Sequence, residues 1–372
     1  EITGLTPSAE YVYRVGDGGS FMSEEKSFTA PKSAADKSFK VIFYSDPQSE
    51  SVENYMSFKD SIDQALKICP NPDLMISAGD TTQNGYKSTE WEACFEVMGD
   101  YYAKYPTVTV AGNHEMKGDW NFISFAQRFN MSGAKTGYPQ FDRTMGYFEY
   151  GDAIFVILNG EVTPADQKAE IMKKELQWCK SVLDASDKKW RVVMTHAGPY
   201  TSNHDPLDVR DYYINDSEYS LDAMGVDLFL NGHDHIYIRS TAKNDIKVNT
   251  GDGTTYLTGG TVGNKFYEYI PARSDYSTDF YVDEEDKQDS PSSSSARIPS
   301  RAPLTRSRMR TTGTASRQWT ATRSATPCAK ANPLPIIPTF RRTRGTTRRR
   351  ITSPRTVCSP ATRRIRLARA RR

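Results

Sequence analysis

From Phe39 onward, short apolar segments that end in polar loops alternate with segments of helical periodicity. The apolar segments have the length of strands and span residues 40–44, 74–77, 107–110, 147–150, 153–158, 191–194, 227–230 and 255–257. Apolar residues at helical spacing predict helices over residues 52–69, 88–98 and 165–183. Because strands and helices alternate, the pattern predicts an α/β fold in which helices cover a layered sheet.

The first 33 residues have a different pattern, that of two short strands around a glycine-rich turn. The first strand spans residues 10–15 and has Tyr11 and Tyr13 at alternate positions, and residues 24–30 form the second strand. The string Gly4-Leu5-Thr6-Pro7 followed by these tyrosines resembles the end of a fibronectin type III-like domain. A generic hairpin fits the same residues. On the first interpretation, most of that sandwich lies outside this sequence.

Charge divides the chain near residue 289. Residues 290–372 hold 21 of the 48 Lys and Arg residues and none of the 46 acidic residues, and 20 of those 21 are Arg. Most other residues there are Ser, Thr, Pro and Ala without an amphipathic period, which predicts disorder. The segment is either an Arg-rich arm for nucleic acid or the product of a shifted reading frame or a fusion. We favour the second interpretation and expect no nucleic-acid binding by this segment.

Two classes of protein are not indicated. The sequence has no run of 18 apolar residues, so it predicts no membrane-spanning helix. Its five cysteines have no CxxC spacing, so they indicate neither a zinc ribbon nor a disulfide framework.

Side chains with carboxylate, amide or imidazole groups follow five of the predicted strands. They lie in the segments Ser45-Asp46-Pro47-Gln48, Gly79-Asp80, Gly112-Asn113-His114-Glu115, Thr195-His196 and Gly232-His233-Asp234-His235. In α/β folds, loops at the carboxyl ends of strands converge on one ligand site. These segments hold four of the five histidines of the chain, and the fifth, His204, follows soon after His196. One histidine alone is more often structural, but four at equivalent positions predict a shared site.

The donor types suggest the ligand of that site. Imidazole, carboxylate and amide groups without a thiol suit a divalent or trivalent transition metal better than calcium. The donors outnumber the needs of one ion, which predicts a pair of ions about 3.5 to 4 Å apart that share a carboxylate. Asp80 is the natural bridge.

These five segments, in this order, resemble those of the calcineurin-like metallophosphoesterases, and in particular the purple acid phosphatase-like branch with an N-terminal fibronectin-like sandwich. The resemblance covers roughly residues 39–266. It implies a layered β-sandwich flanked by helices over residues 38–286, preceded by the remnant of an all-β sandwich over residues 1–33. It also implies a secreted or cell-envelope location.

The resemblance further implies roles for individual residues. The metal ligands would be Asp46 and His235 for the first ion, Asp80 as the bridge, and Asn113, His196 and His233 for the second. His114 would face the scissile phosphate and donate a proton or hydrogen bond to the leaving oxygen, with Asn113 also near the substrate. Glu115 would orient His114 or form a plain salt bridge. His204 would bind phosphate or be a surface residue of its loop.

Two positions depart from the family pattern. Gln48 stands where many members have a histidine ligand, so its amide oxygen would either ligate weakly or hold a metal-bound water. Gln83 stands where purple acid phosphatases have the tyrosine that colours their iron. We therefore expect a colourless enzyme that uses iron, manganese or zinc.

The resemblance implies a dinuclear-metal hydrolase of phosphate esters, with monoesters as the favoured substrates and a metal-bridging hydroxide as the nucleophile. A phosphodiesterase of nucleotides or phospholipid head groups is one alternative. A non-catalytic protein that binds nucleic acid through the basic segment is another, although the complete ligand set argues against it.

Overall fold

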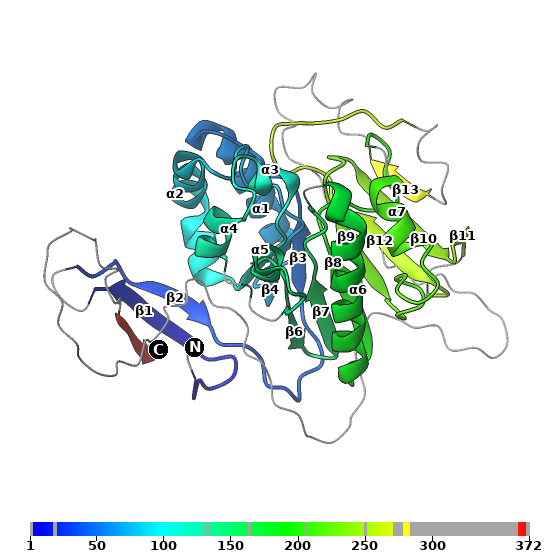
Figure 1. Cartoon of the computed structure of the whole chain (residues 1–372). Coiled ribbons are helices and arrows are strands. Elements are labelled where there is room, and N and C mark those ends of the chain that lie inside the picture. Colours follow the sequence, from blue (N-terminus) through cyan, green and yellow to red (C-terminus); the bar gives the residue numbers. More distant parts are fainter. Residues whose placement is uncertain are drawn as a thin grey trace, which may run out of the picture.

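The computed structural model describes residues 3–17, 21–129, 131, 134–162, 165–204, 207–248, 251–270, 278–282 and 364–369. Two sheets pack face to face, and helices cover their outer faces (Figure 1). The expected layered α/β fold is therefore confirmed.

The smaller sheet is parallel and consists of β3 (Val41–Tyr44), β4 (Leu74–Ser77) and β5 (Thr107–Thr109) in that order. Helices α1 (Val52–Ile68) and α2 (Ser88–Lys104) connect these strands and cover the outer face. The Ser51 side chain caps α1 by accepting a hydrogen bond from the Asn54 N–H. Tyr55, Phe58 and Ile62 of α1 are fully buried in one cluster with apolar residues of β3 and β4.

The larger sheet is mixed and has the strand order β11-β10-β12-β9-β8-β7-β6, with β13 also paired to β10. Its strands are β6 (Gly146–Tyr150), β7 (Ala153–Ile157), β8 (Trp190–Met194), β9 (Leu228–Asn231), β10 (Tyr237–Lys243), β11 (Ile246–Lys247), β12 (Thr254–Thr258) and β13 (Thr278–Val282). Strands β7, β8, β9 and β12 are parallel neighbours. Every residue of β7 is buried, because the smaller sheet covers one face and α6 (Lys168–Ala185) the other.

Several short elements were not predicted. They are α3 (Asn113–Met116), α4 (Ile123–Arg128), α5 (Pro139–Asp142), α7 (Leu207–Tyr213), β10, β11 and β13. The helix predicted over residues 165–183 begins with a turn of 3-10 helix at Ala165–Gln167. The predicted helices were found, although α2 continues six residues past its predicted end at Met98. The polar loops that follow β3, β4, β5, β8 and β9 all lie at the carboxyl ends of parallel strands.

The N-terminal hairpin is present as β1 (Glu10–Gly16) and β2 (Lys26–Thr29), with Phe28 packed against the rings of Tyr11 and Tyr13. It contacts α2, since the Tyr13 hydroxyl donates to the Ala103 carbonyl at 3.1 Å. Its fibronectin-like character stays a prediction.

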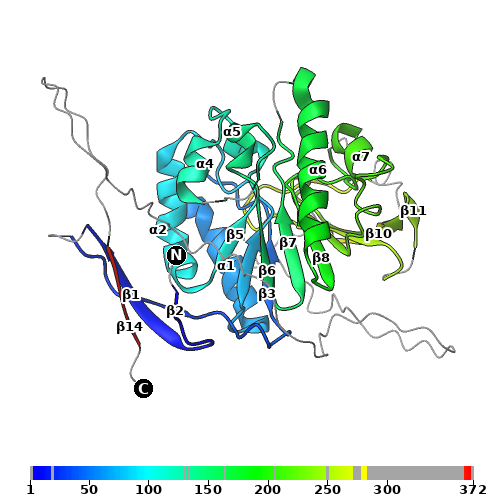
Figure 2. The ribbon, with the colours of Figure 1, turned by 60° about the horizontal axis from the view of Figure 1, so that its bottom comes forward.

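A third strand, β14 (Arg364–Arg369), pairs antiparallel with β1 (Figure 2). The expected disorder of residues 290–372 is therefore wrong for these six residues, because they supply the hydrogen bonds of an edge strand. The rest of that segment lies outside the described residues. Among the helices that the structure describes, none is long and apolar enough to cross a bilayer.

Candidate metal centre

The predicted site residues come together where the carboxyl ends of strands from both sheets meet. Asp46 and Gln48 follow β3, Asp80 follows β4, Asn113 and His114 begin α3 after β5, His196 follows β8, and His233 and His235 follow β9. The first three strands belong to the smaller sheet and the last two to the larger one. The site thus joins the two layers of the sandwich.

Four of these residues have a left-handed backbone, which is uncommon for residues other than glycine. The φ angles are 52° for Asp46, 51° for Asp80, 71° for His233 and 52° for His235. Each such residue costs about 1–2 kcal/mol relative to an ordinary conformation. Strain of this kind gathers at functional sites, where surrounding contacts hold side chains in a required direction.

Asp46, Asp80 and His235 form the first group of candidate ligands, with donor atoms within 4.8 Å of one another. The Nε2 atom of His235 lies 3.5 Å from Asp46 Oδ1. Its other ring nitrogen, Nδ1, donates to the Lys265 carbonyl at 2.5 Å. Since a neutral imidazole has one N–H, this bond leaves the Nε2 lone pair free for a cation.

Asp80, His196 and His233 form the second group within the same 4.8 Å limit. The Nε2 atom of His196 lies 3.2 Å from Asp80 Oδ2 and 3.1 Å from Asn113 Oδ1. His233 Nδ1 also lies 3.1 Å from Asn113 Oδ1, which brings the Asn113 amide to this group. Because Asp80 belongs to both groups, it occupies the position of a bridging ligand.

The electrostatics of both groups call for positive charge. Burial raises the pKa of Asp46 to about 7. Burial alone would lower the pKa of His196, yet the adjacent Asp80 and Asp46 carboxylates raise it well above the usual value. By contrast, burial lowers the pKa of His233 to about 2 and that of His235 to about 4. These two rings are therefore neutral, which is the form that binds metal ions.

The chemistry of the donors fits two transition-metal cations. Three imidazoles, the Asn113 amide oxygen and the buried Asp46 carboxylate lie on either side of the shared Asp80 carboxylate. The Gln48 amide oxygen is buried without a hydrogen-bond partner among the described residues. Buried polar atoms normally have partners, so this oxygen is available to an ion or to its water. Which of these two roles Gln48 has stays a prediction.

His114 lies beside the two groups but is not a member of either. Its Nδ1 donates to the Gln83 carbonyl at 2.7 Å, and its Nε2 faces the Gln48 amide nitrogen and lies 4.0 Å from Asp80 Oδ2. Burial lowers the pKa of His114. The backbone of Gln83 therefore fixes the orientation of this ring.

The contacts of Glu115 differ from both roles expected for it, which were to orient His114 or to form a salt bridge. Its carboxylate is fully buried and accepts hydrogen bonds from four backbone N–H groups, those of Asp80, Thr81, Thr82 and Gly112, at 2.7–3.1 Å. Among the described contacts it neither orients the His114 ring nor forms a salt bridge. Its partners show that it holds the loop that carries Asp80.

Two further residues complete the rim. The ring of His204 lies against that of His233, with centroids 3.9 Å apart, so the structure brings it to the second group. The sequence motif that contains Asp234 predicts no role for it, yet its carboxylate contacts the His204 ring at 3.1 Å. Its position between two histidines was the available signal.

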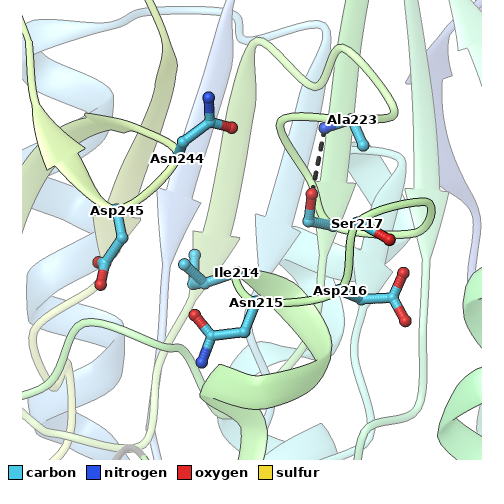
Figure 3. Close-up of a pocket in the computed structure, with 8 residues that line it drawn as sticks. Ile214, Asn215, Asp216, Ser217, Ala223, Asn244 and Asp245 are labelled. Carbon is cyan, nitrogen blue, oxygen red and sulfur yellow. Dashed lines mark hydrogen bonds between the residues drawn. The ribbon is translucent and has the colours of Figure 1, made fainter.

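A cavity of about 290 Å³ lies elsewhere, between the segment that follows α7 and the β10–β11 turn (Figure 3). Its lining is mostly polar and includes Asn215, Asp216 and Asp245. It shares no residue with the candidate metal centre.

Comparisons with known proteins agree with this geometry. The sequence model of a family described as calcineurin-like phosphoesterase matches residues 39–237. The chain is 26% identical to purple acid phosphatase 18 of Arabidopsis thaliana over 196 residues, which cover 50% of this chain and 43% of that protein. It is 27% identical to purple acid phosphatase 23 of the same plant over 298 residues, or 71% of this chain and 61% of that protein.

A solved structure is similar as well. Purple acid phosphatase PPD1 from yellow lupin seeds aligns with a TM-score of 0.56 at 16% identity, over 75% of this chain and 54% of that chain. This likeness concerns the fold. The chain spans about half the length of the relatives that it matches.

Proposed function

Because this chain belongs to the calcineurin-like phosphoesterase family, we propose that it is a metal-dependent hydrolase of phosphate esters, with monoesters as the preferred substrates. The observation that carries the proposal is the place of Asp80 in two groups of ligands at once. A pair of cations at this site, iron, manganese or zinc, would supply Lewis acidity and an activated water.

The residues around the two cation positions would have distinct roles. Asp46, Asp80 and His235 would hold one cation, and Asp80, Asn113, His196 and His233 the other. The carbonyls of Lys265 and Ala78 keep the Nε2 atoms of His235 and His196 directed inward. Since the ligands come from loops of two sheets, packing of the sandwich fixes the distance between the two groups.

His114 is the proposed contact to the leaving group. Its ring lies next to Asp80 but outside both ligand groups, and the Gln83 carbonyl holds it by Nδ1. The Nε2 atom is therefore the one that faces a departing oxygen, and the doubly protonated ring would donate its Nε2 proton there. His204, on the other side of His233, is the proposed second contact to phosphate.

The test is hydrolysis of p-nitrophenyl phosphate by the full chain after loading with each of the three metals. Asp80→Asn and His233→Ala should abolish turnover and lower metal content. His114→Ala should lower turnover with metal content retained. Asp216→Asn, in the separate cavity of Figure 3, is the matched control and should behave as wild type. Loss of metal from His114→Ala would contradict its assigned role.

The choice between monoesters and diesters is tested separately. We expect faster hydrolysis of p-nitrophenyl phosphate than of bis-p-nitrophenyl phosphate, and the reverse order would favour the phosphodiesterase alternative. The proposed secreted or cell-envelope location is supported by family resemblance alone.

A further inference from the structure

A single buried carboxylate, that of Asp234, gathers the loop that carries His204. It accepts hydrogen bonds from three consecutive backbone N–H groups, those of Ser202, Asn203 and His204, at 2.5–3.1 Å. Its Oδ1 atom also lies 3.1 Å from the His204 ring nitrogen Nδ1. Asp234 itself is fully buried and belongs to neither group of candidate metal ligands.

These contacts determine how the His204 ring is presented. A carboxylate only accepts, so the ring nitrogen that faces it carries the proton. In the neutral ring, Nε2 then has a free lone pair, so it accepts a hydrogen bond from a P–OH group of a bound phosphate. The ring is further confined by His233 at 3.9 Å and by the edge of Tyr267 at 5.3 Å, measured between ring centroids. His204 is still about one-third exposed, so the ring is held in place and remains open to solvent.

Asp234 is also linked rigidly to the metal centre through the chain. Its neighbours His233 and His235 both have left-handed backbones and are candidate ligands of different groups. The same short segment after β9 therefore supplies one ligand to each group and, through Asp234, the anchor of the loop after β8. The position of His204 relative to the two cation positions is set by this one segment.

We propose that Asp234 is a positioning residue for phosphate, which acts through His204 and holds its ring at the second ligand group. This inference rests on the proposed function, because it assumes that a phosphoryl group binds there. Asp234 contacts no substrate in this proposal. Its carboxylate fixes the loop and the ring that do.

The experiment measures the affinity of inorganic phosphate for the metal-loaded full chain by calorimetry, together with metal content. His204→Ala should weaken phosphate binding about tenfold, the value of one hydrogen bond to a charged group. Asp234→Asn should weaken it by a similar factor with metal content unchanged. The double variant should match His204→Ala within about twofold, because the two residues act as one unit.

A matched control is Asp227→Asn, which removes the charge of a carboxylate that accepts from the Arg191 N–H of β8. Asp227 immediately precedes β9, at the end of that strand away from Asp234. We expect phosphate affinity like that of wild type. Wild-type affinity in Asp234→Asn, or losses that multiply in the double variant, would overturn the inference.

A measurement on the wild-type chain covers the case in which Asp234→Asn fails to fold. Nitrogen-15 NMR of His204 should show a proton on Nδ1, and a ring protonated on Nε2 alone would overturn the inference. Phosphate binding without ester hydrolysis would refute the proposed function and leave this inference standing. Hydrolysis together with unchanged phosphate affinity in Asp234→Asn would refute this inference alone.

Discussion

Replacement of the buried Glu175 in α6 should change how the stability of the protein depends on pH. Its side chain is fully buried, Oε2 accepts a long hydrogen bond from the Gly160 N–H at 3.3 Å, and Oε1 has no hydrogen-bond partner among the described residues. Burial raises the pKa of this carboxyl from 4.5 to about 8. The folded protein therefore holds a proton that the unfolded chain releases near pH 4.5.

The sign and size of the effect follow from that difference. A raised pKa means that the folded state binds more protons between pH 4.5 and 8, so stability is lost as the pH rises through this window. A difference of about 3.5 pKa units corresponds to about 5 kcal/mol in full, of which about 3 to 4 kcal/mol falls between pH 5 and pH 8. Glu175→Gln is uncharged at every pH and should escape this loss.

The assay is urea unfolding of wild type and Glu175→Gln at pH 5 and pH 8. The stability of the variant relative to wild type should increase with pH by about 3 to 4 kcal/mol. Glu170→Gln is the control on the same helix, because Lys174 lowers the pKa of that exposed carboxyl and keeps it ionised throughout this range. A difference between wild type and Glu175→Gln that is constant with pH would refute the reasoning.

Two further predictions concern the metal centre. A Cβ atom on Gly112 would lie 2.2 Å from Asp80 Oδ1, so Gly112→Ala should displace the bridging carboxylate and lower metal affinity and turnover by ~100-fold, as measured by metal content and ester hydrolysis. Gly99→Ala, whose Cβ would meet no atom within 4 Å, should retain both. Because Gln83 replaces the colouring tyrosine, the iron-loaded chain should show no iron–tyrosinate band in its visible spectrum, and such a band would contradict the assignment of that position.

The sequence was most informative where local pattern and burial agree. Strands β4 and β7 are buried on both faces, so they are continuous apolar runs and were predicted nearly to the residue. Strand β10 was missed because it buries Ser240 and Thr241 beside Ile238, which hides the alternation of apolar and polar residues. Helices of four to seven residues, such as α3 and α7, are too short for a period to appear.

The candidate site also contains residues that the sequence could predict and residues that it could not. The residues of the two candidate ligand groups could be singled out because each follows a recognisable strand and has a distinctive side chain. The parts played by Glu115 and Asp234 were not, since their partners are backbone N–H groups that every residue except proline has, about 30–35 positions away in the chain. The orienting carbonyl of Gln83 has the same property. Such contacts are fixed by tertiary structure and leave no mark on residue type.

Anomalous diffraction from crystals of the manganese-loaded protein would test the central claim most directly. We predict two peaks per chain, about 3.5 to 4 Å apart, with Asp80 between them. One peak should have Asp46 and His235 as neighbours, and the other Asn113, His196 and His233. A single peak, or no peak at this position at saturating manganese, would contradict the account.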